Sequence, residues 1–195
     1  MNLNYKESGV TMIIKNKIES IEMIKSLHLN QFPEELFFKG DEERVTSFLK
    51  KYPAKYYAVR DKSKPGGVFK LKVEASKVLD EIKEYDSFTI NVSSANYDEN
   101  QILVGEIEFL SNGEVYLILS SNPKYSVRDA LRDPDFNLKT NIFDDILNEI
   151  PGFDFIYDYV TKNDLMDVIV EFSLFDIPVG IQNEKIVIYE LRTHY

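Results

Sequence analysis

The stretch DVIVEFSLFDIPVGIQNEKIVIYELRTHY, residues 167–195, decides the fold, because it reads as two strands joined by a turn. Its first strand alternates, so that one face is apolar and carries Val168, Val170, Phe172 and Leu174. Glu171 lies on the other face, between Ile169 and Ser173. A carboxylate in apolar surroundings costs roughly several kcal/mol unless it is paired. We therefore expect Glu171 to have a cation or a hydrogen-bond donor.

The second strand ends in three ionisable residues spaced two apart, Glu190, Arg192 and His194. Alternation predicts that these three share a face with Ile186 and Ile188. If the strands pair through a turn near Gly180, Glu171 and Glu190 lie close together. Two convergent carboxylates are typical of a site for a hard cation such as Mg²⁺. A structural ion pair between Glu171 and a lysine or arginine, at a solvated strand end, explains the pattern as well.

Helices and strands are intermixed along the rest of the chain. Apolar residues at spacings of three and four predict an amphipathic helix over 14–27, and a second helix is expected over 41–52, after a turn at FPEELF. Alternation predicts strands over 54–60, 68–74 and 87–93, and SNG joins a hairpin over 101–120. Shorter helical pieces are expected over 75–85, 126–133, 142–150 and 153–163. The order favours an α+β fold with mainly antiparallel sheets and flanking helices.

The chain has 195 residues, enough for one good hydrophobic core. We expect a single compact domain over residues 1–195. No Pro- or Gly-rich linker marks a boundary within it. If two lobes exist, they span about 12–95 and 96–195, where the chain changes character.

Composition excludes several classes of function. The formal net charge of -10 argues against a nucleic-acid partner, because phosphate binding needs a basic surface. With no cysteine, the chain has no thiolate nucleophile and no zinc–thiolate site. The sequence carries no apolar run of the roughly 20 residues that a membrane span needs, and its first residues lack the pattern of a signal peptide, so we expect a cytoplasmic protein with no membrane partner.

The closing hairpin resembles that of the ATP-grasp nucleotide-binding domain of phosphoenolpyruvate synthase and pyruvate phosphate dikinase. In that family an Asp-x-Glu-aromatic strand is followed, across a short turn, by a strand that ends in Gln-x-Arg. The resemblance implies that Glu171 is a magnesium ligand and that Arg192 contacts phosphate. Glu190 stands where the family has glutamine, and it would be the second metal ligand.

Two stretches near the front of the chain extend the resemblance. KIESIEMIKSLHLNQFPEELF is similar to the opening of the family, where a lysine starts a helix, and Lys17 falls at that lysine. YYAVRDKSKPGG is similar to a Val-Arg-Ser-Ser stretch, which makes Arg60 the phosphate-contacting arginine. In such a fold the strand around Glu106 and Glu108 would supply the contacts to adenine. The serines of the family are replaced here by Asp61 and Lys62.

The resemblance implies a protein that binds ATP and Mg²⁺. If the chain is an enzyme, it is an ATP-dependent phosphotransferase or ligase that transfers phosphate to a small molecule or to a protein partner. The alternative is a non-catalytic acidic module, or a degenerate relative, that binds another protein. Convergence of the candidate charges on one cleft favours the first function, and dispersed charges with an exposed aromatic patch favour the second. The helix expected over 126–133, with Arg128 and Arg132 on one face, is interpreted as a surface helix with local ion pairs.

Overall fold

The closing hairpin forms as expected in the computed structural model, which describes residues 13–14, 17–63 and 68–194, without the side chains of residues 17 and 18. Its strands are β8 (Ile169–Val179) and β9 (Glu184–Arg192), and they pair antiparallel. β8 also pairs with β5 (Gln101–Phe109). β5 pairs in turn with β6 (Glu114–Ser120), and β6 pairs with β7 (Phe136–Asn141). The result is a five-stranded sheet in the order β7-β6-β5-β8-β9.

A second, four-stranded sheet forms from the earlier part of the chain, in the order β1-β4-β2-β3. Its strands are β1 (Glu34–Phe38), β2 (Tyr56–Asp61), β3 (Phe69–Glu74) and β4 (Ser87–Val92). All strand pairs recorded in both sheets are antiparallel. Together with the helices, this confirms the predicted α+β class with mainly antiparallel sheets.

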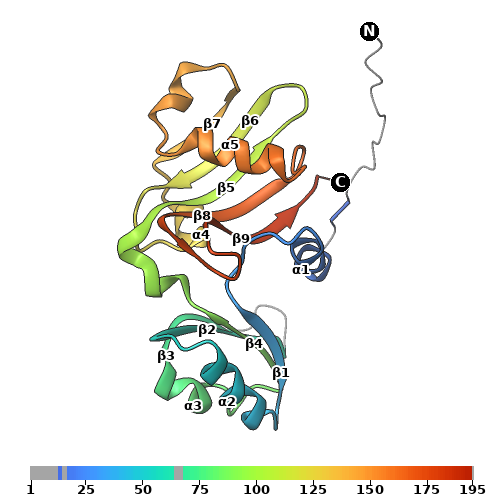
Figure 1. Cartoon of the computed structure of the whole chain (residues 1–195), viewed down its shortest axis with the longest axis vertical. Helices are drawn as coiled ribbons and strands as arrows, with labels where there is room; N and C mark the ends of the chain where they lie inside the picture. Colours follow the sequence, from blue (N-terminus) through green and yellow to red (C-terminus); the bar gives the residue numbers. More distant parts are fainter. Residues whose placement is uncertain (1–12, 15–16, 64–67, 195) are drawn as a thin grey trace.

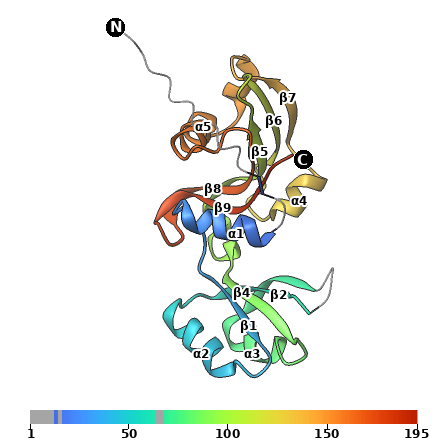
Figure 2. The same ribbon diagram turned by 90° about the vertical axis from the view of Figure 1, so that its right-hand side faces the viewer.

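Helices cover the outer faces of both sheets. Apolar side chains of α2 (Glu42–Lys51) and α3 (Val78–Glu81) pack on the four-stranded sheet, and those of α5 (Phe153–Lys162) pack on the five-stranded sheet. In Figure 1 the five-stranded sheet lies above the four-stranded sheet, and α2 and α3 lie at the bottom of the molecule. α4 (Val127–Arg132) lies on the opposite face of the five-stranded sheet from α5, as Figure 2 shows.

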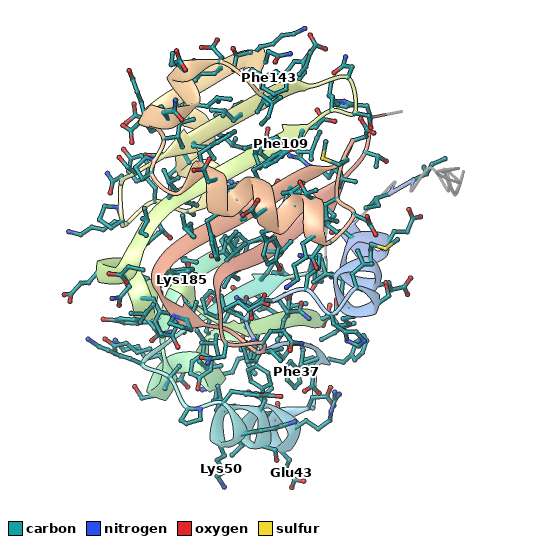
Figure 3. All side chains as sticks on the ribbon, turned by 45° about the horizontal axis from the view of Figure 1, so that its top comes forward. Phe37, Glu43, Lys50, Phe109, Phe143 and Lys185 are labelled. Atoms are coloured by element: carbon teal, nitrogen blue, oxygen red, sulfur yellow. The ribbon has the colours of Figure 1, made fainter. Side chains whose placement is uncertain are left out.

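Two hydrophobic clusters fill the molecule, and Figure 3 labels one aromatic residue from each. Phe37 belongs to the cluster under α2, and Phe109 belongs to the cluster under α5. Phe175 and Val187, from the five-stranded sheet, pack into the cluster of the four-stranded sheet. The two sheets therefore share buried apolar contacts at one end, which fixes their relative position there.

α1 (Lys17–Ser26) packs on β9 of the five-stranded sheet, although it precedes the strands of the other sheet along the chain. The Ser20 hydroxyl accepts a hydrogen bond of 2.8 Å from the backbone N–H of Leu191. The helix predicted over 14–27 forms over the shorter range Lys17–Ser26, with Ile24 buried at 2% exposure, and residues 15 and 16 lie outside the described ones. The division of the chain into lobes near residue 95 stays a prediction.

The structure corrects three local predictions. FPEELF was expected to turn, but Glu34–Phe38 forms β1, because Phe37 is buried and the backbone pairs with β4. β7 was not predicted, and its alternate residues Phe136, Leu138 and Thr140 are only half-buried. The piece over 142–150 forms the short 3₁₀-helix η3 (Asp145–Glu149) rather than an α-helix. Two further 3₁₀ segments are η1 (Ala75–Lys77) and η2 (Ser94–Asn100).

Among the helices in the described part of the chain, none has the length and hydropathy of a membrane-spanning segment.

Candidate functional site

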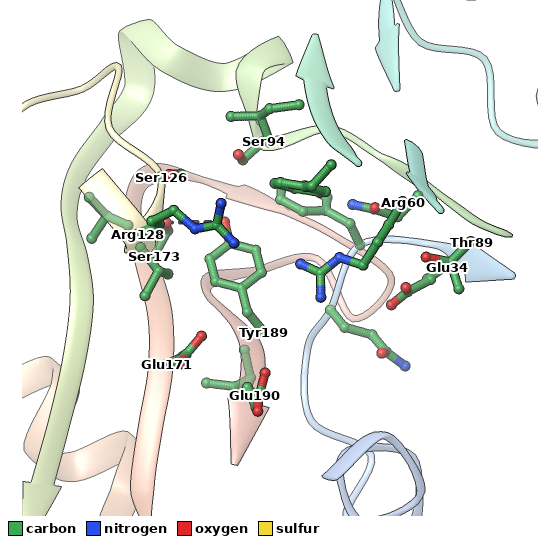
Figure 4. Close-up of a pocket in the computed structure, with 18 of the residues that line it drawn as sticks. Glu34, Arg60, Thr89, Ser94, Ser126, Arg128, Glu171, Ser173, Tyr189 and Glu190 are labelled. Carbon is green, nitrogen blue, oxygen red and sulfur yellow. Dashed lines mark hydrogen bonds between the residues drawn. The ribbon is translucent and has the colours of Figure 1, made fainter. Parts of the chain in front are cut away.

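A cleft with a volume of about 480 Å³ lies between the two sheets (Figure 4). The four-stranded sheet contributes Arg60 and Thr89, and the five-stranded sheet contributes Glu171, Ser173 and Glu190. α1 and α4 line it as well. The cleft falls within the size range of about 300–1,000 Å³ that is usual for small-molecule sites. It is therefore the candidate binding site of the protein.

Arginines enter the cleft from two sides. Arg60 lies on β2, in register with Thr89 of β4, and its guanidinium lies 4.6 Å from the ring centroid of Phe69. Arg128 comes from α4, on the other wall, and Figure 4 shows both side chains reaching toward Tyr189. Guanidinium groups bind phosphate oxygens through paired, charge-assisted hydrogen bonds. Two of them on facing walls suit a ligand with several phosphates.

α4 is held at the cleft by polar contacts at its start. The Ser126 hydroxyl accepts a hydrogen bond from the backbone N–H of Asp129, and the Asp129 carboxylate accepts one from the backbone N–H of Ser126. This capping box fixes the first turn of the helix. The side-chain amide of Gln101, on β5, donates to the carbonyl of Tyr125 at 3.1 Å. α4, and with it Arg128, is thereby tied to the sheet.

Glu171 and Glu190 form a directly opposed pair across β8 and β9. This confirms the prediction that the two residues face each other across the hairpin. Both carboxylates lie below Tyr189 in Figure 4, and both residues line the cleft. The hairpin therefore brings two acidic side chains to the cleft floor, beneath the two arginines.

The register of the hairpin shifts by one residue beside this pair, because Glu171 faces Glu190 whereas Phe172 faces Ile188. Tyr189 is the extra residue of this β-bulge. The expectation that Ile186 and Ile188 share a face with Glu190 is therefore wrong. Both isoleucines belong to the buried cluster under α5, although Ile188 also borders the cleft that Tyr189 and Glu190 line.

Tyr189 closes a short polar chain in the cleft wall. Its hydroxyl lies 3.1 Å from the hydroxyl of Ser173, which lies 3.2 Å from the side-chain oxygen of Gln101. Burial raises the pKa of Tyr189 to about 12, although the hydrogen bond to Ser173 acts in the opposite direction. The phenol therefore stays neutral at physiological pH and serves as a hydrogen-bonding wall of the cleft.

Arg192 lies beside the two glutamates and bridges two strands. Its Nη2 atom donates to Glu106 Oε2 and lies 3.1 Å from Glu171 Oε1. Glu106 and Glu171 are opposed residues of β5 and β8. The sequence left open whether Glu171 meets a metal or a structural arginine, and the structure shows an arginine in contact with it.

Glu106 and Glu108 lie on β5, away from the cleft between the sheets, and line a second cavity of about 460 Å³. Glu108 is 4% exposed, and one of its oxygens lies 2.9 Å from Nε2 of His194. Neither glutamate is among the residues that line the first cleft. Their predicted contact with adenine stays a prediction.

Lys17 is the first residue of α1, and its side chain lies outside the described ones. The glycine-containing loop over 64–67 also lies outside the described residues. Of the seven candidate site residues, the structure thus brings Arg60, Glu171 and Glu190 to one cleft. Arg192 contacts Glu171 from the side of the second cavity.

Sequence reasoning missed Arg128, because the segment around it was interpreted as a surface helix with local ion pairs. The helix is at the surface, but it also lines the cleft. It missed Asn30 as well, which is fully buried and binds the β8–β9 turn. No local sequence pattern identifies the role of either residue, because each one lies beside a segment that is distant in sequence.

A metal ion would have Glu171 and Glu190 as its protein ligands. Within residues 13–14, 17–63 and 68–194, no group of three or more His, Cys, Asp or Glu side chains is placed to hold a metal by itself. Mg²⁺ is commonly held by one or two carboxylates together with the phosphates of a nucleotide. The carboxylates of Glu171 and Glu190 therefore suit a metal ion that binds together with a phosphorylated ligand.

Several solved enzyme structures match this chain over most of its length. The N5-carboxyaminoimidazole synthetase from Staphylococcus aureus matches with 12% identity and a TM-score of 0.48, over 92% of this chain and 44% of that one. An ADP complex of an N5-carboxyaminoimidazole ribonucleotide synthetase matches with 14% identity and a TM-score of 0.46, over 92% and 45%. The D-alanine-D-alanine ligase from Helicobacter pylori matches with 14% identity and a TM-score of 0.44, over 91% and 50%.

This chain thus spans about half the length of these enzymes. No family model matches the sequence, and no curated protein matches it either. At TM-scores below 0.5 the likenesses do not assign a family. The functional argument therefore depends on the residues of the cleft.

Proposed function

We propose that this chain is an ATP-grasp-like protein that binds ATP with Mg²⁺ in the cleft between its two sheets. One observation carries the proposal. Arg60 and Arg128 reach into the cleft from different elements, above the opposed carboxylates of Glu171 and Glu190. Cations around a phosphate chain and carboxylates for its metal are the two requirements of a nucleotide site for phosphoryl transfer.

The walls of the cleft provide a place for the base as well as for the phosphates. Leu71 on β3, Val104 on β5 and Val127 on α4 line it together with Tyr189. Small-molecule sites combine such apolar walls with a few polar groups that fix orientation. An adenine ring would pack on the apolar side, and its phosphates would extend toward Arg60 and Arg128.

Glu171 and Glu190 would hold the metal together with phosphate oxygens. When bound, Mg²⁺ would neutralise charge on the phosphates, which favours attack by an acceptor. Arg192 competes for Glu171, since its Nη2 lies 3.1 Å from the carboxylate. The protein should therefore bind the metal weakly until a nucleotide supplies further oxygen ligands.

The acceptor would be a small molecule or a protein partner, and the reaction would make the chain an ATP-dependent phosphotransferase or ligase. The specific likeness to phosphoenolpyruvate synthase and pyruvate phosphate dikinase remains part of this proposal. It is supported by the confirmed pairing of Glu171 with Glu190 and by the place of Arg60 in the cleft.

Calorimetric titration with ATP and MgCl₂ tests the proposal. Wild type should bind, and Arg60→Gln should weaken binding by about tenfold or more, because a charge-assisted hydrogen bond is lost. Glu171→Gln should weaken binding of ATP in the presence of Mg²⁺ more than in EDTA. Lys50→Gln is the matched control, since Lys50 is an exposed cation on α2 that points away from the sheets in Figure 3.

Absence of ATP binding by wild type, with or without Mg²⁺, would overturn the proposal. An equal loss of affinity in Arg60→Gln and Lys50→Gln would also contradict it, because a general charge effect would then explain the result.

A non-catalytic interaction module is the second candidate, and one observation favours it. Phe143 is 91% exposed, so its ring is available for contact with a partner. Figure 3 shows it at the end of the molecule beyond the five-stranded sheet. Capture of a partner that depends on Phe143, by a protein that does not bind ATP, would favour this function.

A further inference from the structure

The second cavity lies on the same face of the five-stranded sheet as the glutamate pair, on the other side of Arg192. Its volume is about 460 Å³. Glu108, Tyr116 and Lys139 are opposed residues of β5, β6 and β7, so their side chains stand in a row along this face. Arg192 separates the two cavities, because it contacts Glu106, which lines the second, and Glu171, which lines the first.

Glu108 is the unusual residue of this cavity. It is 4% exposed, and its Oε2 lies 2.9 Å from Nε2 of His194. Its other oxygen, Oε1, is buried, with no hydrogen-bond partner in the described part of the chain. A buried carboxylate oxygen without a donor is costly to keep. Oε1 of Glu108 is therefore an unused hydrogen-bond acceptor.

The surroundings of Glu108 define what kind of donor fits. Apolar side chains of Ile118 and Ile169 line the cavity, together with the ring of Tyr116. The Nζ atom of Lys139 lies 4.7 Å from the ring centroid of Tyr116 and 3.6 Å from Oε1 of Glu114. The ammonium group therefore interacts with those two side chains rather than with Glu108. A molecule with an apolar body and a cationic donor complements such a cavity better than an anion does.

We infer that the second cavity binds a small molecule that carries a primary ammonium group, with Glu108 as its anchoring carboxylate. The ammonium donates to Oε1 of Glu108, and the apolar part of the molecule packs against Tyr116 and Ile169. His194, whose side chain is 71% exposed, covers the other carboxylate oxygen at the entrance. This site is separate from the proposed nucleotide cleft and does not depend on it.

Titration of the ¹⁵N-labelled full chain with benzylamine, followed by NMR, tests the inference. Amide signals of β5 and β6 around Glu108 and Tyr116 should shift. Benzyl alcohol has the same shape but no charge, and it should bind about tenfold more weakly, because the charge-assisted hydrogen bond is lost. Glu108→Gln should weaken benzylamine binding by a similar factor. Glu149→Gln removes an exposed carboxylate elsewhere and should leave the affinity unchanged.

His194→Ala keeps the test decisive if Glu108→Gln does not fold, since His194 is exposed. Removal of its ring frees a second carboxylate oxygen, so benzylamine should bind at least as tightly as to wild type. The inference is overturned if benzylamine leaves β5 and β6 unshifted, or if benzyl alcohol binds equally well. Displacement of benzylamine by ATP would also overturn it, because the amine would then occupy the other cleft.

Discussion

The guanidinium of Arg192 contacts Glu171 at 3.1 Å and also donates to Glu106 on the neighbouring strand. Glu106, Glu171 and Glu190 are opposed residues of three adjacent strands, so three carboxylates stand in one row across the sheet. Like charges opposite each other destabilise a sheet. Arg192 contacts two carboxylates of this row, those of Glu106 and Glu171.

Arg192→Gln should therefore lower the free energy of unfolding by roughly 1–3 kcal/mol, because it removes the positive charge that contacts the partly buried carboxylates of Glu106 and Glu171. Mg²⁺ should then raise the melting temperature of the variant more than that of wild type, since a divalent cation replaces the lost charge. Thermal unfolding with MgCl₂ and with EDTA measures both effects. Arg44→Gln is the control, because Arg44 also bridges two carboxylates but lies on the exposed surface.

The sequence predicts the parts of this site that depend on residues close together in the chain, and not those that depend on distant ones. Alternation within residues 167–195 placed Glu171 opposite Glu190 correctly, because pairing in a hairpin is set by short-range order. The bulge at Tyr189 was not predictable, since no local residue marks it, and it moved Ile188 to the core face. The role of Arg128 depends on where α4 docks, which no periodicity encodes.

The same distinction holds for the fold. Strands with clear alternation, such as β4, were predicted, and the alternate residues Phe88 and Ile90 of this strand are buried. Although the edge strands β3 and β9 were predicted, β1 and β7 were missed. Their conformation follows from a partner distant in sequence more than from their own residues.

Asn30 should be essential to the closing hairpin, although no sequence pattern points to it. Its side-chain amide donates to the carbonyls of Val179 and Ile186 at 2.9 and 2.8 Å, and its side-chain oxygen accepts from the backbone N–H of Gln182. Asn30→Ala should lower the free energy of unfolding by roughly 2–4 kcal/mol, because buried backbone groups lose their partners. Denaturant titration measures the change. Asn112→Ala, which removes an exposed amide in another turn, should cost less than about 1 kcal/mol.

Gly105 should not tolerate a side chain. A Cβ atom there would lie 2.1 Å from the carbonyl oxygen of Ile118 on the paired strand β6, and the φ angle is +151°. Gly105→Ala should therefore destabilise the protein by roughly 3 kcal/mol or more, since backbone must move. Gly40→Ala is the matched control, with a φ of +96° and nothing within 4 Å of the added atom. If both variants lose equal stability in denaturant titrations, backbone conformation rather than the approach of β6 is responsible.

Tyr189 should make stability depend on alkaline pH. Burial raises the pKa of its phenol to about 12 in the folded protein, against an ordinary value of 10.0. A raised folded-state pKa means that the folded chain keeps the proton longer than the unfolded chain does. The contribution to stability is therefore complete below pH 10 and is lost as the pH rises toward 12.

Tyr189→Phe removes this titration, so its stability should fall less steeply than that of wild type between pH 10 and 12. Between pH 10 and 12, the free energy of unfolding of wild type should fall by roughly 1–3 kcal/mol more than that of the variant. Denaturant unfolding at half-unit steps of pH measures it, and the subtraction cancels the titration of the other tyrosines and of the lysines. Parallel curves for the two proteins would mean that Tyr189 ionises in the folded state as easily as in the unfolded chain, which would contradict the raised pKa of its phenol in the cleft wall.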